Sequence, residues 1–235
     1  MFNSLQHTPI IVLCGGQGIR LRSMISDRPK VLAPLGEQTL LDNIIAMLHA
    51  AGFEKIILSV GYLKKQIKSH CWARGYQVVF SEEDEPLGTG GALKSAMKHI
   101  DTDVFFVMNG DMIFKPDFSR LLSLQRERNG VMSLFVTRGY QGDGGTVIKT
   151  DSANRIVHWR ERKPEDKPEK LYLSAGTYFM KKGIARFFPN SKSFSLEKEV
   201  FPALFSEPCY GYRTDELLID IGVPERYALA QKLFS

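Results

Sequence analysis

The sequence predicts an α/β fold, in which a doubly wound, mostly parallel sheet is followed by a smaller antiparallel layer. In the first 130 residues, short uninterrupted apolar runs alternate with segments of helical period. Strands that are apolar on both faces are typical of a parallel sheet covered by helices on both sides. After Gly130 the expected strands follow one another with little helix between them, which indicates antiparallel pairing. No repeat or low-complexity linker divides the chain, so we expect one domain over residues 1–235, with halves at about 1–130 and 131–235.

The first half is expected to alternate strands with helices. The strands are predicted at residues 9–14, 55–60, 76–80 and 104–108, and the helices at 40–51, 63–69 and 91–98. The helix over residues 40–51 has the clearest ends, because Thr39 is placed to cap its N-terminus and Gly52 follows its C-terminus.

The second half is expected to be richer in strands. These are predicted at residues 131–136, 146–150, 155–159 and 171–180. A helical segment at 196–204 and a strand at 217–221 follow. The last helix is expected to start at Pro224, since proline suits the first turn of a helix.

The composition is that of an ordinary globular protein. Hydrophobic residues make up 43% of the chain, and its apolar runs are far shorter than the ~20 residues needed to cross a bilayer, so we expect no membrane association. The N-terminal residues lack the features of a signal peptide. Three widely spaced cysteines, Cys14, Cys71 and Cys209, argue against a disulfide framework and a structural zinc site. We therefore expect a cytoplasmic protein.

The charge is moderately positive, with 31 Lys and Arg against 26 Asp and Glu, or +5. A nucleic-acid-binding protein would show a cluster or stripe of basic residues, whereas the charged stretch at residues 160–167 mixes both signs. We therefore expect small-molecule substrates and no nucleic acid, and a small polyanion fits the charge. The sequence leaves the oligomeric state open and is compatible with a homo-oligomer.

The loop after the first expected strand has the chemistry of a phosphate site. Its glycines let backbone N–H groups approach an anion closely. Arg20 can clamp phosphate oxygens with its planar fork, and Lys30 supplies a compact positive charge. Neither the Walker A pattern nor the dinucleotide fingerprint is present, which disfavours a dehydrogenase.

Two aspartates follow or end buried strands at the edge where ligands of parallel sheets bind. Asp111 could hold Mg²⁺, which prefers one or two carboxylates with phosphate oxygens and waters, or it could simply cap a turn. Asp220 lies in an apolar run and needs a partner, either a metal or an arginine. The two carboxylates could share one Mg²⁺ ion.

Five separated segments carry a resemblance to a known family. They are residues 13–22, Pro29-Lys30, residues 85–92, Asn109-Gly110-Asp111 and residues 220–225. In this order they resemble the sugar-1-phosphate nucleotidyltransferase family. The run Pro-Leu-Gly-Thr-Gly-Gly-Ala at 86–92 and the short chain are most similar to its D-glycero-D-manno-heptose 1-phosphate guanylyltransferases. The resemblance implies a Rossmann-like fold of the nucleotide-diphospho-sugar transferase type.

The resemblance also implies a reaction. An oxygen of the sugar 1-phosphate attacks the α-phosphorus of a nucleoside triphosphate, and pyrophosphate leaves. That phosphate has a second pKa of about 6, so at neutral pH it is mostly ionised and needs no general base. By resemblance, Arg20 holds the departing phosphates, Lys30 bridges the sugar phosphate and the α-phosphate, and Arg20, Lys30 and Asp111 form the catalytic set. Asp111 and Asp220 hold the Mg²⁺ cofactor.

The remaining contacts implied by the resemblance fall into two sets. The nucleotide set is Leu13, Gly15, Gly16, Gly18, Arg20, Glu83, Pro86, Gly88 and Thr89. The sugar-phosphate set is Gly110, Gly145, Glu161, Arg162 and Gly176, with Lys163 as an alternative to Arg162.

The resemblance also implies that the base contacts Glu83 or an acidic neighbour among residues 82–85. A carboxylate only accepts hydrogen bonds, and guanine offers two adjacent donors where uracil offers one, so GTP is favoured. A UTP- or CTP-dependent hexose 1-phosphate enzyme is the first alternative. A catalytically silent protein that binds nucleotide sugars is the second, and the retention of Arg20, Lys30, Asp111 and Asp220 together favours the enzyme.

Overall fold

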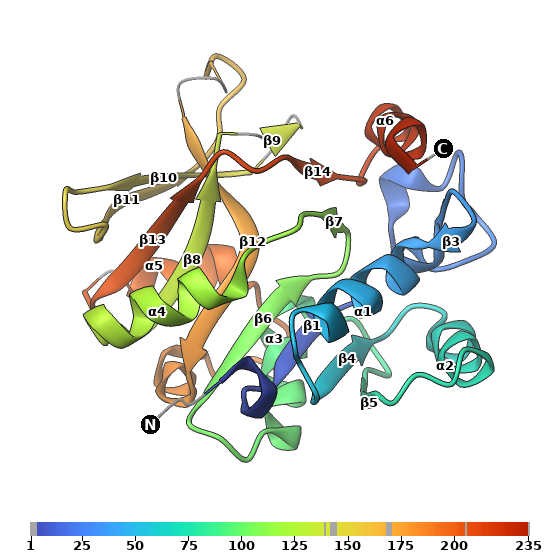
Figure 1. Ribbon diagram of the computed structural model, residues 1–235, viewed down its shortest axis with the longest axis horizontal. Coiled ribbons are helices and arrows are strands. Elements are labelled where there is room, and N and C mark those ends of the chain that lie inside the picture. The colour runs from blue at the N-terminus through green and yellow to red at the C-terminus, as the bar shows by residue number, and fades with distance from the viewer. Residues whose placement is uncertain (1–3, 139, 142–144, 168–170, 205, 235) are drawn as a thin grey trace.

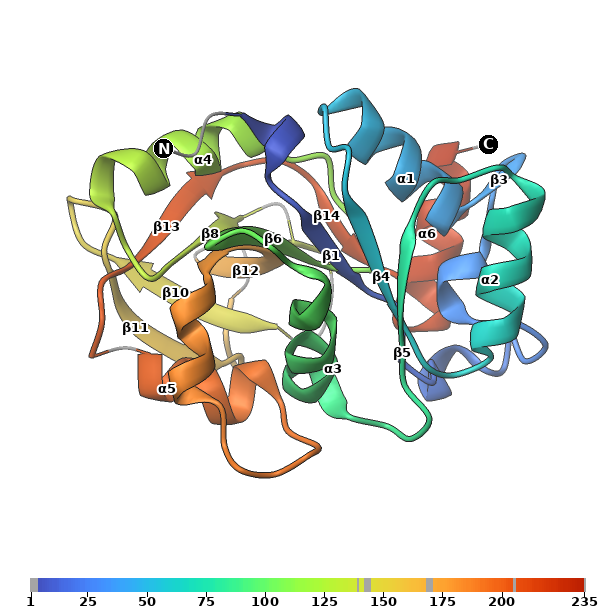
Figure 2. The same ribbon diagram turned by 90° about the horizontal axis from the view of Figure 1, so that it is seen from below.

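A nine-stranded sheet crosses the whole molecule and is covered by helices on both faces, which confirms the predicted α/β fold class (Figures 1 and 2). The computed structural model describes residues 4–138, 140–141, 145–167, 171–204 and 206–234. In Figure 2, α1 and α4 lie on one side of the sheet and α3 and α5 on the other.

The first half of the chain supplies the parallel part of the sheet. Its strands are β1 (Ile10–Leu13), β4 (Ile56–Val60), β5 (Val79–Glu82) and β6 (Val104–Asn109), in the spatial order β6-β1-β4-β5. In the registers, Ile10 pairs with Ile56 on one side and with Phe106 on the other. The carboxyl ends of these strands therefore meet at one edge.

Most strands of the second half extend the same sheet, mainly by antiparallel pairing. They are β8 (Met132–Thr137), β10 (Thr146–Thr150), β11 (Ile156–Glu161), β12 (Tyr172–Lys181) and β13 (Cys209–Thr214). β12 is antiparallel to β6, β8 and β10, β11 is antiparallel to β10, and β13 is parallel to β8. Two small sheets are separate: β7 (Met112–Ile113) with β14 (Leu218–Asp220) and β9 (Tyr140–Gln141), and β2 (Pro34–Leu35) with β3 (Gln38–Thr39).

The helices vary in length and type. The α-helices are α1 (Leu40–Ala50), α2 (Lys64–Ala73), α3 (Gly88–Ala96), α4 (Phe118–Arg128), α5 (Phe201–Leu204) and α6 (Pro224–Phe234). Short 3₁₀ turns are η1 (Leu5–His7), η2 (Ile19–Leu21), η3 (Lys30–Leu32), η4 (Met97–His99) and η6 (Lys182–Phe187), and η7 (Leu196–Val200) is π-helical. Among the described helices, none is long and apolar enough to span a bilayer.

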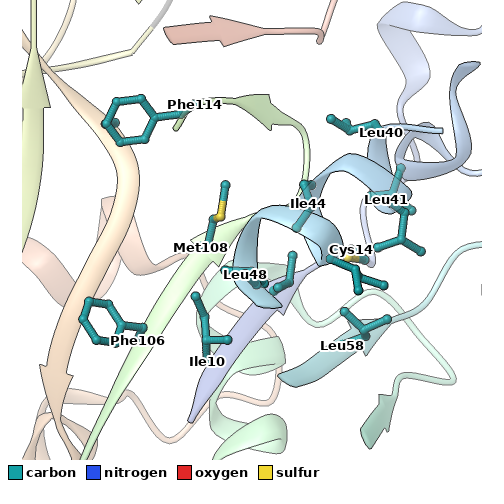
Figure 3. Packing of buried hydrophobic residues seen from close by; sticks show 14 of the residues in the cluster. Ile10, Cys14, Leu40, Leu41, Ile44, Leu48, Leu58, Phe106, Met108 and Phe114 are labelled. Atoms are coloured by element: carbon teal, nitrogen blue, oxygen red, sulfur yellow. The ribbon is translucent and has the colours of Figure 1, made fainter. Parts of the chain in front are cut away.

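The sheet separates two hydrophobic cores. Along β6, Phe106 and Met108 point into the core beneath α1 and α4, while Phe105 and Val107 point into the core beneath α3 and α5. Figure 3 shows the first core, where Phe106 lies near Ile10. This burial on both faces explains why the sequence of the parallel strands is uninterruptedly apolar.

Besides several two-residue strands and short 3₁₀ turns, two longer elements lie outside the sequence expectations, α4 and β13. Helix α4 buries Phe118 and Leu121, but charged and polar residues cover its other face. Strand β13 contains Gly211, and its pairing partner, β8, is distant in the sequence. Some boundaries also differ: α3 begins three residues before the expected start at 91, β5 covers 79–82 instead of 76–80, and α2 ends at 73 instead of 69.

Helix α3 begins early because its glycines allow another loop to pack against it. The carbonyl oxygen of Phe194 accepts hydrogen bonds from the N–H groups of Gly90 and Gly91. A Cβ at Gly90 would lie 2.3 Å from the Phe194 ring. The glycines that weaken helix propensity are thus required for close packing at the N-terminus of α3.

A buried carboxylate joins α1 to α2. Asp42 accepts hydrogen bonds from the N-cap Thr39, from His70 and from the Tyr76 hydroxyl at 2.8–2.9 Å. Burial by itself would raise the pKa of Asp42, but these hydrogen bonds outweigh it and lower the pKa from 3.8 to about 2. The ionised form therefore stabilises the fold above the unfolded-state pKa.

We expect Asp42→Asn to lower the unfolding free energy by about 2–4 kcal/mol at pH 7, because partners of a buried carboxylate lose their acceptor. The stabilisation from Asp42 is lost as the pH falls from about 4 towards 2, so the difference between variant and wild type should shrink there. Urea unfolding at pH 7 and pH 2.5 measures this. Asp101→Asn, at an exposed ion pair with Lys55, is the control and should leave the unfolding free energy nearly unchanged at both pH values. An equal deficit at both pH values would contradict the prediction.

Candidate functional site

A cavity of ≈ 660 Å³ opens at the carboxyl ends of the parallel strands. Its walls come from the loop after β1, the loop between β5 and α3, the end of β6 and the turn after β14. All nine residues of the predicted nucleotide set line it, and so do Lys30 and Asp111. The structure thus brings residues from five separate segments of the chain to one place.

The glycine loop allows one wall of the cavity to approach another. A Cβ at Gly15 would lie 2.6 Å from Oε1 of Glu83, so a larger residue here would displace that carboxylate. A Cβ at Gly16 would have no neighbouring atom within 4 Å. Gly18 has a φ of +58°, a left-handed conformation that favours glycine, and it leads into the turn that carries Arg20.

Glu83 is the acidic residue of the run 82–85 whose side chain faces the cavity. It is 7% exposed and accepts hydrogen bonds from Ser59 Oγ and from the backbone N–H of Leu87, each at 3.2 Å. The other three acids of the run instead pair with lysines: Glu82 with Lys68, Asp84 with Lys64 and Glu85 with Lys192. Among the described residues no cation pairs with the Glu83 carboxylate, which leaves it as an acceptor for a ligand.

Asp111 and Asp220 converge as predicted, and Lys30 lies between them. Lys30 Nζ donates to Asp111 Oδ2 at 2.8 Å and lies 3.6 Å from Asp220 Oδ1. Asp220 also has the arginine partner that its burial requires, because Arg226 contacts its Oδ2 at 2.9 Å. The backbone N–H of Gly222 donates to Asp220 Oδ1 at 2.7 Å.

This arrangement fits a magnesium ion chemically. Two carboxylates already reach a single cationic group, the Lys30 ammonium. Mg²⁺ commonly takes one or two carboxylates and completes its coordination with water and phosphate oxygens. The Arg20 guanidinium lies close by, since a Cβ on Gly222 would be 3.1 Å from its Nη2. Asp111 and Asp220 are therefore the residues that would hold the ion.

The predicted sugar-phosphate set forms two groups outside the lining of this cavity. Gly110 and Gly176 lie at the end of β6, where a Cβ on Gly176 would be 2.9 Å from Asn109 Nδ2. Gly145, Glu161 and Arg162 lie together at the end of the β10–β11 pair, where the N–H of Arg162 donates to the Gly145 carbonyl at 2.9 Å.

Three residues of the site region were given no role from the sequence, although one of them, Asn109, stands in a matching motif. Asn109 lines the cavity, and its Oδ1 is buried without a hydrogen-bond partner among the described residues. Arg226 balances Asp220, and Glu197 accepts a hydrogen bond from Thr89. The position of Asn109 just before Gly110 was a usable signal, whereas Arg226 and Glu197 follow from tertiary contacts.

Comparison with known proteins gives a consistent picture. The family model described as "Nucleotidyl transferase" matches residues 9–233. The chain is 32% identical over 226 residues to D-glycero-alpha-D-manno-heptose 1-phosphate guanylyltransferase of Aneurinibacillus thermoaerophilus, covering 94% of this chain and 96% of that protein. It is 30% identical to mannose-1-phosphate guanylyltransferase of Mycobacterium tuberculosis, covering 92% of this chain and 62% of that protein.

A solved structure is also similar. The crystal structure of HddC from Yersinia pseudotuberculosis complexed with GMP-PN has a TM-score of 0.81 and 27% identity. The match covers 97% of this chain and all of that one. The likeness extends over both halves of the chain, including the antiparallel strands.

We expect Gly15→Ala to lower the unfolding free energy by about 1–3 kcal/mol, because the added methyl needs the space of a carboxylate held by Ser59 and Leu87. Gly16→Ala is the matched control, since its methyl would point into open space, and it should change stability by less than about 0.5 kcal/mol. Urea unfolding compares the two variants. Equal stability of the two would show that Glu83 is not held against Gly15.

Proposed function

Because the chain belongs to the nucleotidyl transferase family and is an enzyme, we propose that it transfers guanylate from GTP to a sugar 1-phosphate with release of pyrophosphate. The observation that carries this proposal is the convergence of the glycine loop, Arg20, Lys30, Asp111 and Glu83 on one cavity. Such a set can bind a triphosphate at one end and a base at the other. The guanylyltransferases among the relatives support the choice of reaction.

The proposed chemistry needs positioning and charge but no base. The attacking phosphate oxygen is already ionised at neutral pH. Arg20 and the N–H groups of the glycine loop would hold the departing phosphates, and Lys30 would bind the oxygens around the reacting phosphorus. A Mg²⁺ ion held by Asp111 and Asp220 would supply further positive charge on the phosphates. The chain then orients the two substrates and stabilises charge.

The preference for guanine rests on Glu83. Its carboxylate can accept from N1–H and the exocyclic amino group of guanine at once. Ser59 and the N–H of Leu87 hold it at the cavity wall, so it needs little rearrangement to do so. The related HddC structure contains GMP-PN, which supports a guanine nucleotide.

For the acceptor we propose D-glycero-D-manno-heptose 1-phosphate. The support is the heptose enzyme from Aneurinibacillus, to which the chain is similar over almost its whole length. The mannose enzyme points in the same direction, because mannose and this heptose share the manno arrangement of ring hydroxyls. A pyrophosphate-release screen of the common nucleoside triphosphates against a panel of sugar 1-phosphates tests the whole proposal. The greatest activity with a nucleotide other than GTP would contradict it.

We expect Asp111→Asn to lower kcat/KM by about 10²-fold or more, because a group that holds positive charge at the phosphates is lost. Its melting temperature should stay within a few degrees of wild type, since the side chain is 41% exposed. Pyrophosphate release measures the turnover, and direct Mn²⁺ titration measures the binding of a divalent ion. Asp101→Asn is the control for a distant exposed carboxylate. Undiminished turnover and unchanged Mn²⁺ binding would refute the metal role.

We expect Glu83→Gln to reduce the ratio of kcat/KM for GTP over UTP by about tenfold. The amide presents N–H donors where guanine also presents donors, so one hydrogen bond to a charged acceptor is lost. Competition assays with both nucleotides measure the ratio. Glu82→Gln is a matched neighbour whose carboxylate pairs with Lys68 and should leave the ratio unchanged. If both variants discriminate like wild type, Glu83 does not read the base.

A further inference from the structure

The π-helical turn η7 connects the nucleotide cavity to the second half of the chain. The Thr89 hydroxyl, in the cavity wall, donates to Glu197 Oε2 at 2.8 Å and accepts from the backbone N–H of Leu196 at 2.9 Å. Lys198, which follows Glu197 in the chain, has its Nζ 3.5 Å from Oε1 of Glu161 at the end of β11. One short turn thus contacts both the nucleotide set and the predicted sugar-phosphate set.

The Glu197 carboxylate has an unusual environment for a half-buried acid. No cation pairs with it in the part of the chain that the structure describes. Its hydrogen bonds, from Thr89 and from Ser195 Oγ at 3.0 Å, both use Oε2, so Oε1 remains available as an acceptor. A carboxylate with spare acceptor capacity, in contact with Thr89 of the cavity wall, suits a ligand that donates hydroxyl groups.

Tyr178 belongs to the core beneath α3 and α5 and lies within electrostatic reach of Glu197. The ring is fully buried on β12, and burial, with a smaller effect from the Glu197 carboxylate, raises the pKa of its hydroxyl. The hydroxyl therefore stays protonated and lies 3.4 Å from Ser174 Oγ. Because this hydroxyl is enclosed in the core, the side chain that remains to recognise a sugar hydroxyl is the half-buried Glu197 carboxylate.

We infer that Glu197 determines sugar specificity, by accepting a hydrogen bond from a ring hydroxyl of the sugar 1-phosphate while Thr89 holds it in place. This inference rests on the proposed function. The inference extends that function because Glu197 lies outside the sets implied by the motifs. It also places the sugar ring between Thr89 and Glu161. The carboxylate here acts by contact with substrate and transfers no proton.

A purely structural role of Glu197 would give different effects on substrate binding. Glu197 could simply fix the first turn of α3 through Thr89. In that case its loss would lower stability and weaken both substrates alike, because Thr89 belongs to the nucleotide cavity. Specific weakening of the sugar 1-phosphate separates the two roles.

The test compares Glu197→Gln with wild type, using GTP and mannose 1-phosphate or the heptose 1-phosphate. We expect KM for the sugar 1-phosphate to rise about tenfold, which is the loss of one hydrogen bond to a charged acceptor, with KM for GTP changed less than about twofold. Glu199→Gln is the matched control on the same turn. Its carboxylate accepts from the Ser195 N–H and is exposed, so both KM values should stay at wild-type levels.

Mannose 1-phosphates that each lack one ring hydroxyl identify the contact. One of them should lose about tenfold in kcat/KM with wild type and no more than about twofold with Glu197→Gln, since the variant has already lost that hydrogen bond. Equal changes in both KM values, or equal losses for every deoxy sugar in both proteins, would overturn the inference while the guanylyltransferase activity stands. A wild-type protein that makes no nucleotide sugar from any pair would overturn the proposed function and the inference together.

Discussion

The position of Lys30 between Asp111 and Asp220 is the interaction on which the site depends. The three residues come from η3, from the end of β6 and from β14, which are far apart in the chain. The Lys30 and Asp220 side chains are only 10% and 13% exposed, so each charge needs a partner. Arg226 completes the balance, with two cations against two carboxylates. Because Lys30 and Asp220 are mostly buried, removing either would leave a buried charge with fewer partners, so this cluster holds η3 and β14 together.

A balanced cluster has consequences for ligand binding. Within the proposed function, a nucleoside triphosphate brings several negative charges to a site whose own charges already cancel. Additional positive charge must come from Arg20, from the N–H groups of the glycine loop or from a divalent cation between the carboxylates. Lys30 would then exchange a carboxylate partner for a phosphate. Its pairing with Asp111 and Asp220 already holds the ammonium in place, so the exchange would need little reorganisation.

The family resemblance and the local chemistry of the glycine loop together predicted which residues of the nucleotide set line the cavity. The glycines, Arg20 and Lys30 have the chemistry of an anion site that can be read from neighbouring residues. The end of a buried parallel strand can also be read, because the uninterrupted apolar run stops there. The convergence of Asp111 with Asp220 followed from the rule about strand ends. Arg226 and Glu197 could not be found this way, because only tertiary packing brings Glu197 to Thr89 across more than a hundred residues.

The sheet topology explains why the sugar half was harder to read. The rule that ligands bind at carboxyl ends of strands holds for β1, β4, β5 and β6, but β12 runs in the opposite direction, with Thr177 opposite Met108. Its amino-terminal residues therefore reach the ligand edge, and its pairing with β8 breaks between Ser174 and Tyr178. Gly176 lies within this break, with a φ of +62° that lets the strand pass close to Asn109. A glycine in mid-strand thus marks the junction of the two halves of the site.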